Sequence, residues 1–379
     1  MDLTDRIARR QTRTRDGGLV VDLSPMNPVV HMAEPVGRGP VLERLLDVLD
    51  PVFHQQLPDD VAVYGPRGSG KSAIVSALFA GLNDQVGRRR ERIGTTTRAG
   101  SAERTVQFVR VDAYSATSEF RFYHTLLNAV VEESVPERGV GTDTLRERLQ
   151  DQFKPPTRRA VIAVDHVGEA EDVSVADVRE WLAPVGDAVA LLTIGRDVPP
   201  GWAGETVHVP GYRQHALVDI LTARASQALT SGALRHGQAR RIAEWAEGDA
   251  HDALAAAFGA ADVADTDAAG RVSASAVDAG IDAVPEDCVH VGRVLTLPEN
   301  RRRVLSELLR LDGTPTLREA AAAIADGSDL TEGTVERFLY ELAETGILER
   351  VRADEGDGSG RRPSRVEPRF PTLVFRRIG

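Results

Sequence analysis

A glycine-rich stretch of eight residues has the composition and spacing of a phosphate-binding loop. Residues 65–72 read GPRGSGKS, after the apolar run VAVY and before the helical run AIVSALFA. Glycines let backbone N–H groups close around phosphates, and the start of a helix adds partial positive charge. The match to G-x-x-x-x-G-K-[ST] between a strand and a helix predicts an ATP or ADP site. The residues predicted to form it are Gly65, Gly68, Ser69, Gly70, Lys71 and Ser72.

A second stretch, VIAVDHVGEA at 161–170, has the pattern of the strand that binds Mg²⁺ in P-loop ATPases. Asp165 ends its apolar run, so we expect this carboxylate and the Ser72 hydroxyl to hold Mg²⁺. Such enzymes usually carry a catalytic Glu at the next position, where this chain has His166. Glu169 is an alternative base if the loop folds back. Whether the chain is an enzyme stays open at this point.

The surrounding pattern predicts an α/β fold with a parallel sheet covered by helices on both faces. Apolar runs at 105–114, 161–165 and 189–195 alternate with helical segments, which is typical of parallel sheets. Ligands bind such sheets at the carboxyl ends of the strands, where Gly65, Asp165 and Arg196 fall. Residues 214–261 are wholly helical and predict a small lid beside the nucleotide.

The last part of the chain predicts a winged helix-turn-helix. Three helical runs from 298 to 346 are separated by glycine-containing turns and followed by two strand-like runs around the tip ADEGDGSGRRPS. The alternative is a helical bundle that docks proteins. We divide the chain into an arm at 1–33, a nucleotide-binding base at 34–213, a lid at 214–297 and the winged helix at 298–379.

Composition excludes several classes of protein. The 379 residues include a single cysteine, Cys288, so an internal disulfide and a Cys₄ zinc site are impossible. No apolar run approaches the length of a membrane span, and we expect a cytoplasmic, nucleoid-associated protein with no membrane partner. The net charge is −11, with Lys71 and Lys154 as the only lysines. A salt-adapted organism and a GC-rich genome explain this bias equally well.

Positive charge gathers at the C-terminus despite the acidic total. Residues 361–379 contain six arginines and one glutamate. Arg361, Arg362 and Arg365 lie beside the glycine-rich tip of the predicted wing, so we expect them to bind DNA by entering the minor groove. The alternative is that they pair with acidic neighbours at 354–357. The helix expected to read bases, TEGTVERFLYELAE at 331–344, carries four glutamates and one arginine.

The order of these segments resembles the archaeal Orc1/Cdc6 replication initiators, which are AAA+ proteins with a C-terminal winged helix. The stretches that carry the resemblance are EPVGRGPVLERLLDVLDPVF, SVPERGVGTDTLRERL, VPGYRQHALVDILTARASQAL and the passage from 272 to 305, and together the match spans about 34–379. The resemblance implies that Tyr212 and Arg224 help to hold the nucleotide. It also implies duplex origin DNA as a ligand, with the replicative helicase or another Orc1/Cdc6 paralogue as protein partners.

The chain departs from the family at three positions linked to hydrolysis. His166 replaces the Glu, Arg196 replaces an Asn after the fourth strand, and the lid motif Gly-Asp-Ala-Arg-Arg reads GDAHD at 248–252, with His251 in place of an arginine. A missing base costs about 10² to 10⁴ in rate. We therefore expect an ATP- or ADP-binding origin-recognition initiator with weak or absent hydrolysis.

Two other functions fit less of the sequence. One is a divergent paralogue that acts as a nucleotide-bound DNA-binding regulator, or as a partner-binding module, without loading helicase. The other is a signalling P-loop ATPase that also carries a winged helix. The sequence has no appended sensor repeats to favour the latter.

Overall fold

The computed structural model describes residues 18–94, 105–131, 133–169, 173–311, 313, 315–352 and 364–379, with side chains of 87–94 left out. The chain divides into two compact units, one formed by His31–Tyr212 and the other by Met1–Val30 with Arg213–Gly379. Within the described residues, none of the helices combines the length and apolar character needed to span a bilayer.

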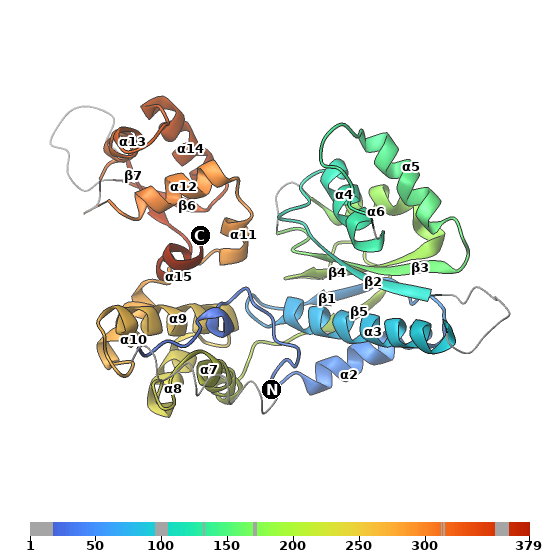
Figure 1. The fold of residues 1–379 in the computed structure, drawn as a ribbon, viewed down its shortest axis with the longest axis horizontal. Coiled ribbons are helices and arrows are strands. Elements are labelled where there is room, and N and C mark those ends of the chain that lie inside the picture. The colour runs from blue at the N-terminus through green and yellow to red at the C-terminus, as the bar shows by residue number, and fades with distance from the viewer. Residues whose placement is uncertain are drawn as a thin grey trace. The chain divides into compact units, whose positions relative to one another are not determined.

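The first unit is built around a parallel sheet (Figure 1). Its strands, in the described residues, stand in the order β2-β3-β4-β1-β5. They are β1 (Val61–Tyr64), β2 (Thr105–Asp112), β3 (Arg158–Asp165), β4 (Val189–Gly195) and β5 (Glu205–His208). The predicted fold class is confirmed, and the four strands expected from the apolar runs are all present. β5 is an additional edge strand that pairs with β1.

Helices cover both faces of this sheet (Figure 1). One face packs against α2 (Gly39–Val48) and α3 (Lys71–Gly94), and the other against α4 (Glu119–Val130), α5 (Thr142–Phe153) and α6 (Val175–Leu182). Strand β3 is buried on both sides, because Val161 and Ala163 face the first group while Ile162 and Val164 face the second. An apolar run without alternation therefore forms a central parallel strand. The short helices η2 (Asp50–His54) and η3 (Ala183–Ala188) join these elements.

The second unit begins with a group of four helices. They are α7 (Gln214–Ala228), α8 (His236–Trp245), α9 (Ala250–Thr266) and α10 (Ala274–Asp282). Helix α9 is rich in alanine and almost wholly buried. A Cβ on Gly280 of α10 would lie 2.3 Å from the carbonyl oxygen of Ala256, so the absence of a side chain lets the two helices approach closely. The N-terminal segment joins this group through η1 (Ser24–Met26) and a bridge between Val20 and Leu229.

The chain ends in helices followed by a two-stranded antiparallel sheet, as the winged-helix prediction requires. The elements are α11 (Val291–Leu295), α12 (Glu299–Leu308), α13 (Leu317–Asp326), α14 (Glu332–Glu344), β6 (Leu348–Arg352), β7 (Ser364–Pro368) and α15 (Thr372–Ile378). Val335, Phe338 and Leu342 line the buried face of α14. Helix α15 was not predicted. Its Thr372 N–H donates to the Ala283 carbonyl at 3.0 Å, and Arg377 pairs with Asp262 at 3.7 Å.

Candidate functional site

The glycine-rich loop connects β1 to α3 and is closely packed by its own unit. Gly65 has φ +153° and Gly70 has φ +79°. A Cβ on Gly65 would lie 2.0 Å from the carbonyl oxygen of Val209, and a Cβ on Gly70 would lie 2.5 Å from Tyr212 Oη. Both positions therefore need glycine for packing and for backbone conformation. At these two glycines no side chain covers the main chain of the loop. A phosphate-binding loop needs such exposed backbone, because its N–H groups must approach the phosphates closely.

Lys71 begins α3 and is only 8% exposed. Its Nζ donates to the carbonyl oxygens of Gly65 and Pro66, each at 2.8 Å. The ammonium is thus held by the loop whose N–H groups are predicted to bind phosphate. Ser72, the predicted Mg²⁺ ligand of this loop, is half-buried in the first turn of α3. The phosphate and metal contacts of these residues stay predictions.

Arg38 is a residue of this site that the sequence reasoning missed. It lies just before α2 and is 5% exposed. Its Nη2 donates to the Ser69 carbonyl at 2.6 Å, and its guanidinium carbon lies 3.5 Å from the centroid of the Tyr212 ring. Tyr212 itself packs against Gly70. A buried arginine and an aromatic ring therefore support the loop at Ser69 and Gly70, and only the tyrosine had been singled out.

The acidic part of the site lies where β2 and β3 end. Asp112 and Asp165 are register partners on these neighbouring parallel strands. Asp165 is 1% exposed, and its Oδ1 accepts from the His166 N–H at 3.0 Å. In the described part of the chain its Oδ2 accepts no hydrogen bond, although Arg110 Nε lies 3.4 Å away. A buried carboxylate oxygen without a hydrogen-bond donor is chemically suited to bind Mg²⁺.

His166 has a left-handed backbone, with φ +60°. Its Nδ1 lies 3.1 Å from Asp112 Oδ1, and its ring stacks on Tyr114 with centroids 4.4 Å apart. Burial alone would lower the pKa of His166, but the charges of Asp165 and Asp112 and the hydrogen bond to Asp112 outweigh it and raise the pKa. Burial would likewise raise the pKa of Asp112, and its contacts with His166 lower it instead. The histidine is thus a partner of Asp112.

Glu169 and Arg196, two further residues that the sequence analysis linked to hydrolysis, contact each other. Glu169 Oε2 lies 3.3 Å from Arg196 Nε. The Arg196 carbonyl accepts from the Gly65 N–H at 3.1 Å, which places β4 and the glycine-rich loop side by side. The structure thus brings Glu169, the predicted substitute base, into an ion pair with Arg196, where the resemblance implies an Asn.

Arg224 lies in the other unit, on α7, and is 8% exposed. Its two terminal nitrogens donate to the carbonyl oxygens of Pro25 and Val30, at 2.8 and 2.9 Å. The buried Arg224 guanidinium therefore anchors the N-terminal segment on α7. The predicted contact of Arg224 with nucleotide stays a prediction.

His251, where the resemblance implies an arginine, is 4% exposed. Its Nε2 accepts from the Val291 N–H at 3.1 Å, and its Nδ1 lies 2.9 Å from Asp252 Oδ1. Cys288 Sγ lies close by, so the three side chains resemble a metal-ligand set. Because Nε2 accepts a hydrogen bond, the proton is on Nδ1 and faces Asp252. Neither nitrogen then offers a metal a lone pair, and the cluster joins α9 to α11 instead.

The predicted wing is described only at its base. Arg361 and Arg362 lie outside the described residues. Arg365 is on β7, and its Nε donates to Glu367 Oε1 at 2.8 Å. The acidic neighbours expected as alternative partners of these arginines also lie outside the described residues. The DNA-binding role of the three arginines therefore stays a prediction.

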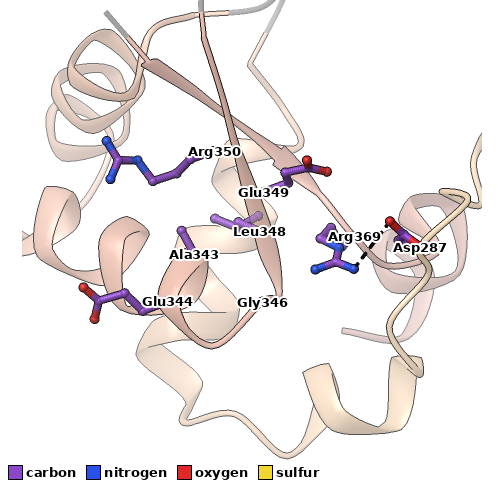
Figure 2. A pocket seen from close by; sticks show the side chains of 8 residues that line it. All are labelled: Asp287, Ala343, Glu344, Gly346, Leu348, Glu349, Arg350 and Arg369. Carbon is purple, nitrogen blue, oxygen red and sulfur yellow. Dashed lines mark ion pairs between the residues drawn. The ribbon is translucent and has the colours of Figure 1, made fainter. Parts of the chain in front are cut away.

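Helix α14 presents an acidic outer face, as its sequence indicated. Glu341 is paired with Arg301 at 3.0 Å, and Glu332 lies 3.8 Å from Arg318. At the end of this helix a shallow pocket of about 290 Å³ opens toward β6 (Figure 2). Arg369 and Asp287 form an ion pair of 3.9 Å at its edge. Its lining residues are Asp287, Ala343, Glu344, Gly346, Leu348, Glu349, Arg350 and Arg369.

Comparisons with known proteins agree with this architecture. The AAA ATPase domain family matches residues 34–194. The "ORC1-type DNA replication protein" of Thermococcus onnurineus is 23% identical over 346 residues, covering 83% of this chain and 80% of the relative.

Two solved structures have a similar fold. The ORC1 protein of Aeropyrum pernix, solved in complex with DNA, has a TM-score of 0.62 at 21% identity and covers 95% of this chain and 96% of that one. The ORC2 protein of the same organism, solved as ADPNP-ADP complexes, has a TM-score of 0.54 at 16% identity, with 95% and 97% covered. The chain is therefore similar in sequence and in fold to ORC1-type proteins, and its residues 34–194 match an AAA ATPase domain.

Proposed function

We propose that this chain is a replication initiator that binds ATP or ADP together with duplex origin DNA and hydrolyses ATP weakly or not at all. The proposal rests on one combination of features. The chain has a tightly packed phosphate-loop fold followed by a winged helix. In the same chain Asp165 is buried, and within the described residues one of its carboxylate oxygens accepts no hydrogen bond. The solved relatives that hold DNA or adenine nucleotides support this assignment by analogy.

The nucleotide is proposed to bind at the loop from Gly65 to Ser72. Its backbone N–H groups and the Lys71 ammonium would meet the phosphates, and Tyr212 with Arg38 would support the loop from behind. Asp165 and Ser72 supply the oxygen donors that a hard divalent cation prefers. Bound Mg²⁺ would neutralise phosphate charge there. Arg224 is proposed to contribute from the lid, by family resemblance.

Weak hydrolysis follows from how the two basic candidates are engaged. His166 Nδ1 is 3.1 Å from Asp112 Oδ1, and the ring is fixed by stacking on Tyr114. Glu169 is paired with Arg196 at 3.3 Å. A general base must reach the attacking water with a free lone pair. An imidazole fixed by Asp112 and a carboxylate neutralised by arginine are both poorly placed for that task.

DNA binding is proposed to depend on the wing. Arg361 and Arg362 follow the glycine-rich tip in the sequence, and Arg365 starts the returning strand β7. Helix α14 carries an excess of glutamates on its outer face, which repels phosphate. In this proposal the protein is cytoplasmic and nucleoid-associated, and it recruits the replicative helicase or another Orc1/Cdc6 paralogue.

The acidic α14 also favours a second candidate function. A divergent paralogue that no longer loads helicase would use this surface for a basic protein partner while nucleotide and DNA binding persist. The two candidates differ in DNA specificity. Chromatin immunoprecipitation from the source organism would give a single enriched site beside the gene for an initiator, and dispersed sites for a regulator.

Calorimetry with ADP and Mg²⁺ tests the nucleotide proposal. Lys71→Ala is expected to weaken ADP binding strongly because the phosphates lose their cation. Lys154→Ala is the matched control, since it removes the other lysine, which is exposed at the end of α5. Equal affinity of the wild type and Lys71→Ala would overturn the proposal. Single-turnover assays with ATP should show little product over minutes, and rapid turnover would overturn the hydrolysis part.

A further inference from the structure

Arg110 occupies an unusual place beside the proposed magnesium site. It lies on β2 two residues before Asp112, so both side chains point to the same face of the sheet. Its Nε is 3.4 Å from Asp165 Oδ2, the oxygen that accepts no hydrogen bond in the described residues. Its Nη2 is 4.0 Å from Asp112 Oδ2, and its Nη1 donates to Ser76 Oγ on α3 at 2.7 Å.

These contacts hold the guanidinium in a defined place. Ser76 lies in the helix that begins at the phosphate loop, while the two aspartates end neighbouring strands. The Arg110 side chain is 28% exposed and Asp165 is 1% exposed, so solvent screens their attraction only in part. Arginine keeps its charge at every physiological pH. Asp165 therefore already has a cation next to the oxygen that Mg²⁺ would use.

We propose that Arg110 is a built-in counter-cation for Asp165, so that this chain binds ADP or ATP with little dependence on Mg²⁺. The inference rests on the proposed nucleotide function and specifies how its metal site is regulated. A divalent ion that approaches Asp165 must either displace the guanidinium or remain beside it. Both routes weaken Mg²⁺ binding, because the first breaks an ion pair and the second places like charges close together.

The test compares ADP affinity in excess Mg²⁺ and in excess EDTA, measured by calorimetry on the full chain. Wild type is expected to change by less than about threefold between the two conditions, whereas Arg110→Gln should gain about tenfold or more from Mg²⁺ because the competing charge is gone. Arg110→Lys keeps the charge and should behave like wild type. Arg148→Gln, at an exposed position on α5, is the matched control and should also behave like wild type.

Several results would overturn the inference. A wild-type affinity that falls about tenfold or more in EDTA would do so alone, even if Arg110→Gln did not fold. An Arg110→Gln protein that folds but gains no more from Mg²⁺ than wild type would also overturn it. Absence of ADP binding in both conditions would remove the nucleotide proposal itself, and this inference with it. Tight binding with strong Mg²⁺ dependence would remove only the role of Arg110.

Discussion

Replacing His166 by Glu would give the chain the residue that P-loop ATPases usually carry after the magnesium aspartate. We expect His166→Glu to destabilise the unit that contains the parallel sheet and to leave hydrolysis slow. The reason is Asp112, whose Oδ1 lies 3.1 Å from His166 Nδ1. A carboxylate in this place would face Asp112 and the buried Asp165 together, and three acidic groups would share one end of the sheet.

The size of the effect follows from the distances. Two unit charges 4 Å apart interact by about 4 kcal/mol at an effective dielectric constant of about 20. Asp112 is 28% exposed, so solvent reduces the repulsion between Asp112 and the new carboxylate below this value. We expect the free energy of unfolding to fall by about 3 kcal/mol, which lowers the unfolding midpoint of a unit of this size by about 6 to 12 °C.

Differential scanning calorimetry of the full chain at pH 8 measures this loss. Asp112→Asn in combination with His166→Glu removes the nearest like charge and should recover about half of it. Faster single-turnover hydrolysis is also expected in the double variant, because a charged Asp112 no longer repels its new carboxylate. A His166→Glu protein as stable as wild type would refute the reasoning. So would a double variant no more stable than the single one.

Three further predictions follow from the same structure. The pKa of His166 is raised in the folded chain. The stability that its protonation contributes is therefore fully present below the unfolded pKa and is lost as pH rises through the folded pKa. The free energies of unfolding of wild type and His166→Gln, measured in urea, should differ more at pH 6 than at pH 9. Gly70→Ala should lower ADP affinity by at least about tenfold, and adding Tyr212→Phe should restore part of it, because the Cβ would lie 2.5 Å from Tyr212 Oη; no rescue would mean that the clash is not the cause. Arg361→Ala with Arg362→Ala should reduce the slope of log DNA affinity against log salt by up to about 2, and an unchanged slope would contradict the wing assignment.

The sequence predicted the elements whose signals are local. The strands that end near Gly65, Asp165 and Gly195 are continuous apolar runs, and such runs indicate central parallel strands. β5 was missed because it has four residues, three of them exposed, at the edge of the sheet. Helix α15 was missed because residues 369–379 follow a strand and contain one proline and three arginines. Its helical form depends on packing against α9.

Contacts between distant residues were beyond the sequence signals. Asp112 and Arg110 were part of a predicted strand, and nothing local showed that β2 would lie beside β3 with Asp112 opposite Asp165. Arg38 was not singled out, because no local pattern showed that it would contact Ser69 and Tyr212. His251 was singled out only because it stands where the resemblance implies an arginine. Its hydrogen bond with the Val291 N–H, 40 residues away, has no local signal. In each case the partner is set by topology and not by spacing.

Residues 18–30 belong to the same compact unit as the C-terminal half of the chain. They pair with α7 through the bridge at Val20 and Leu229 and through the two hydrogen bonds from Arg224. In topological terms the predicted nucleotide-binding base is an insertion within a discontinuous domain, whose two pieces are separated by 182 residues of sequence (31–212). A fragment that starts at Arg213 would lack its own partner segment and leave the buried Arg224 guanidinium without these acceptors. Joining residue 30 to residue 213 through a short linker would instead keep that domain whole and leave out the base.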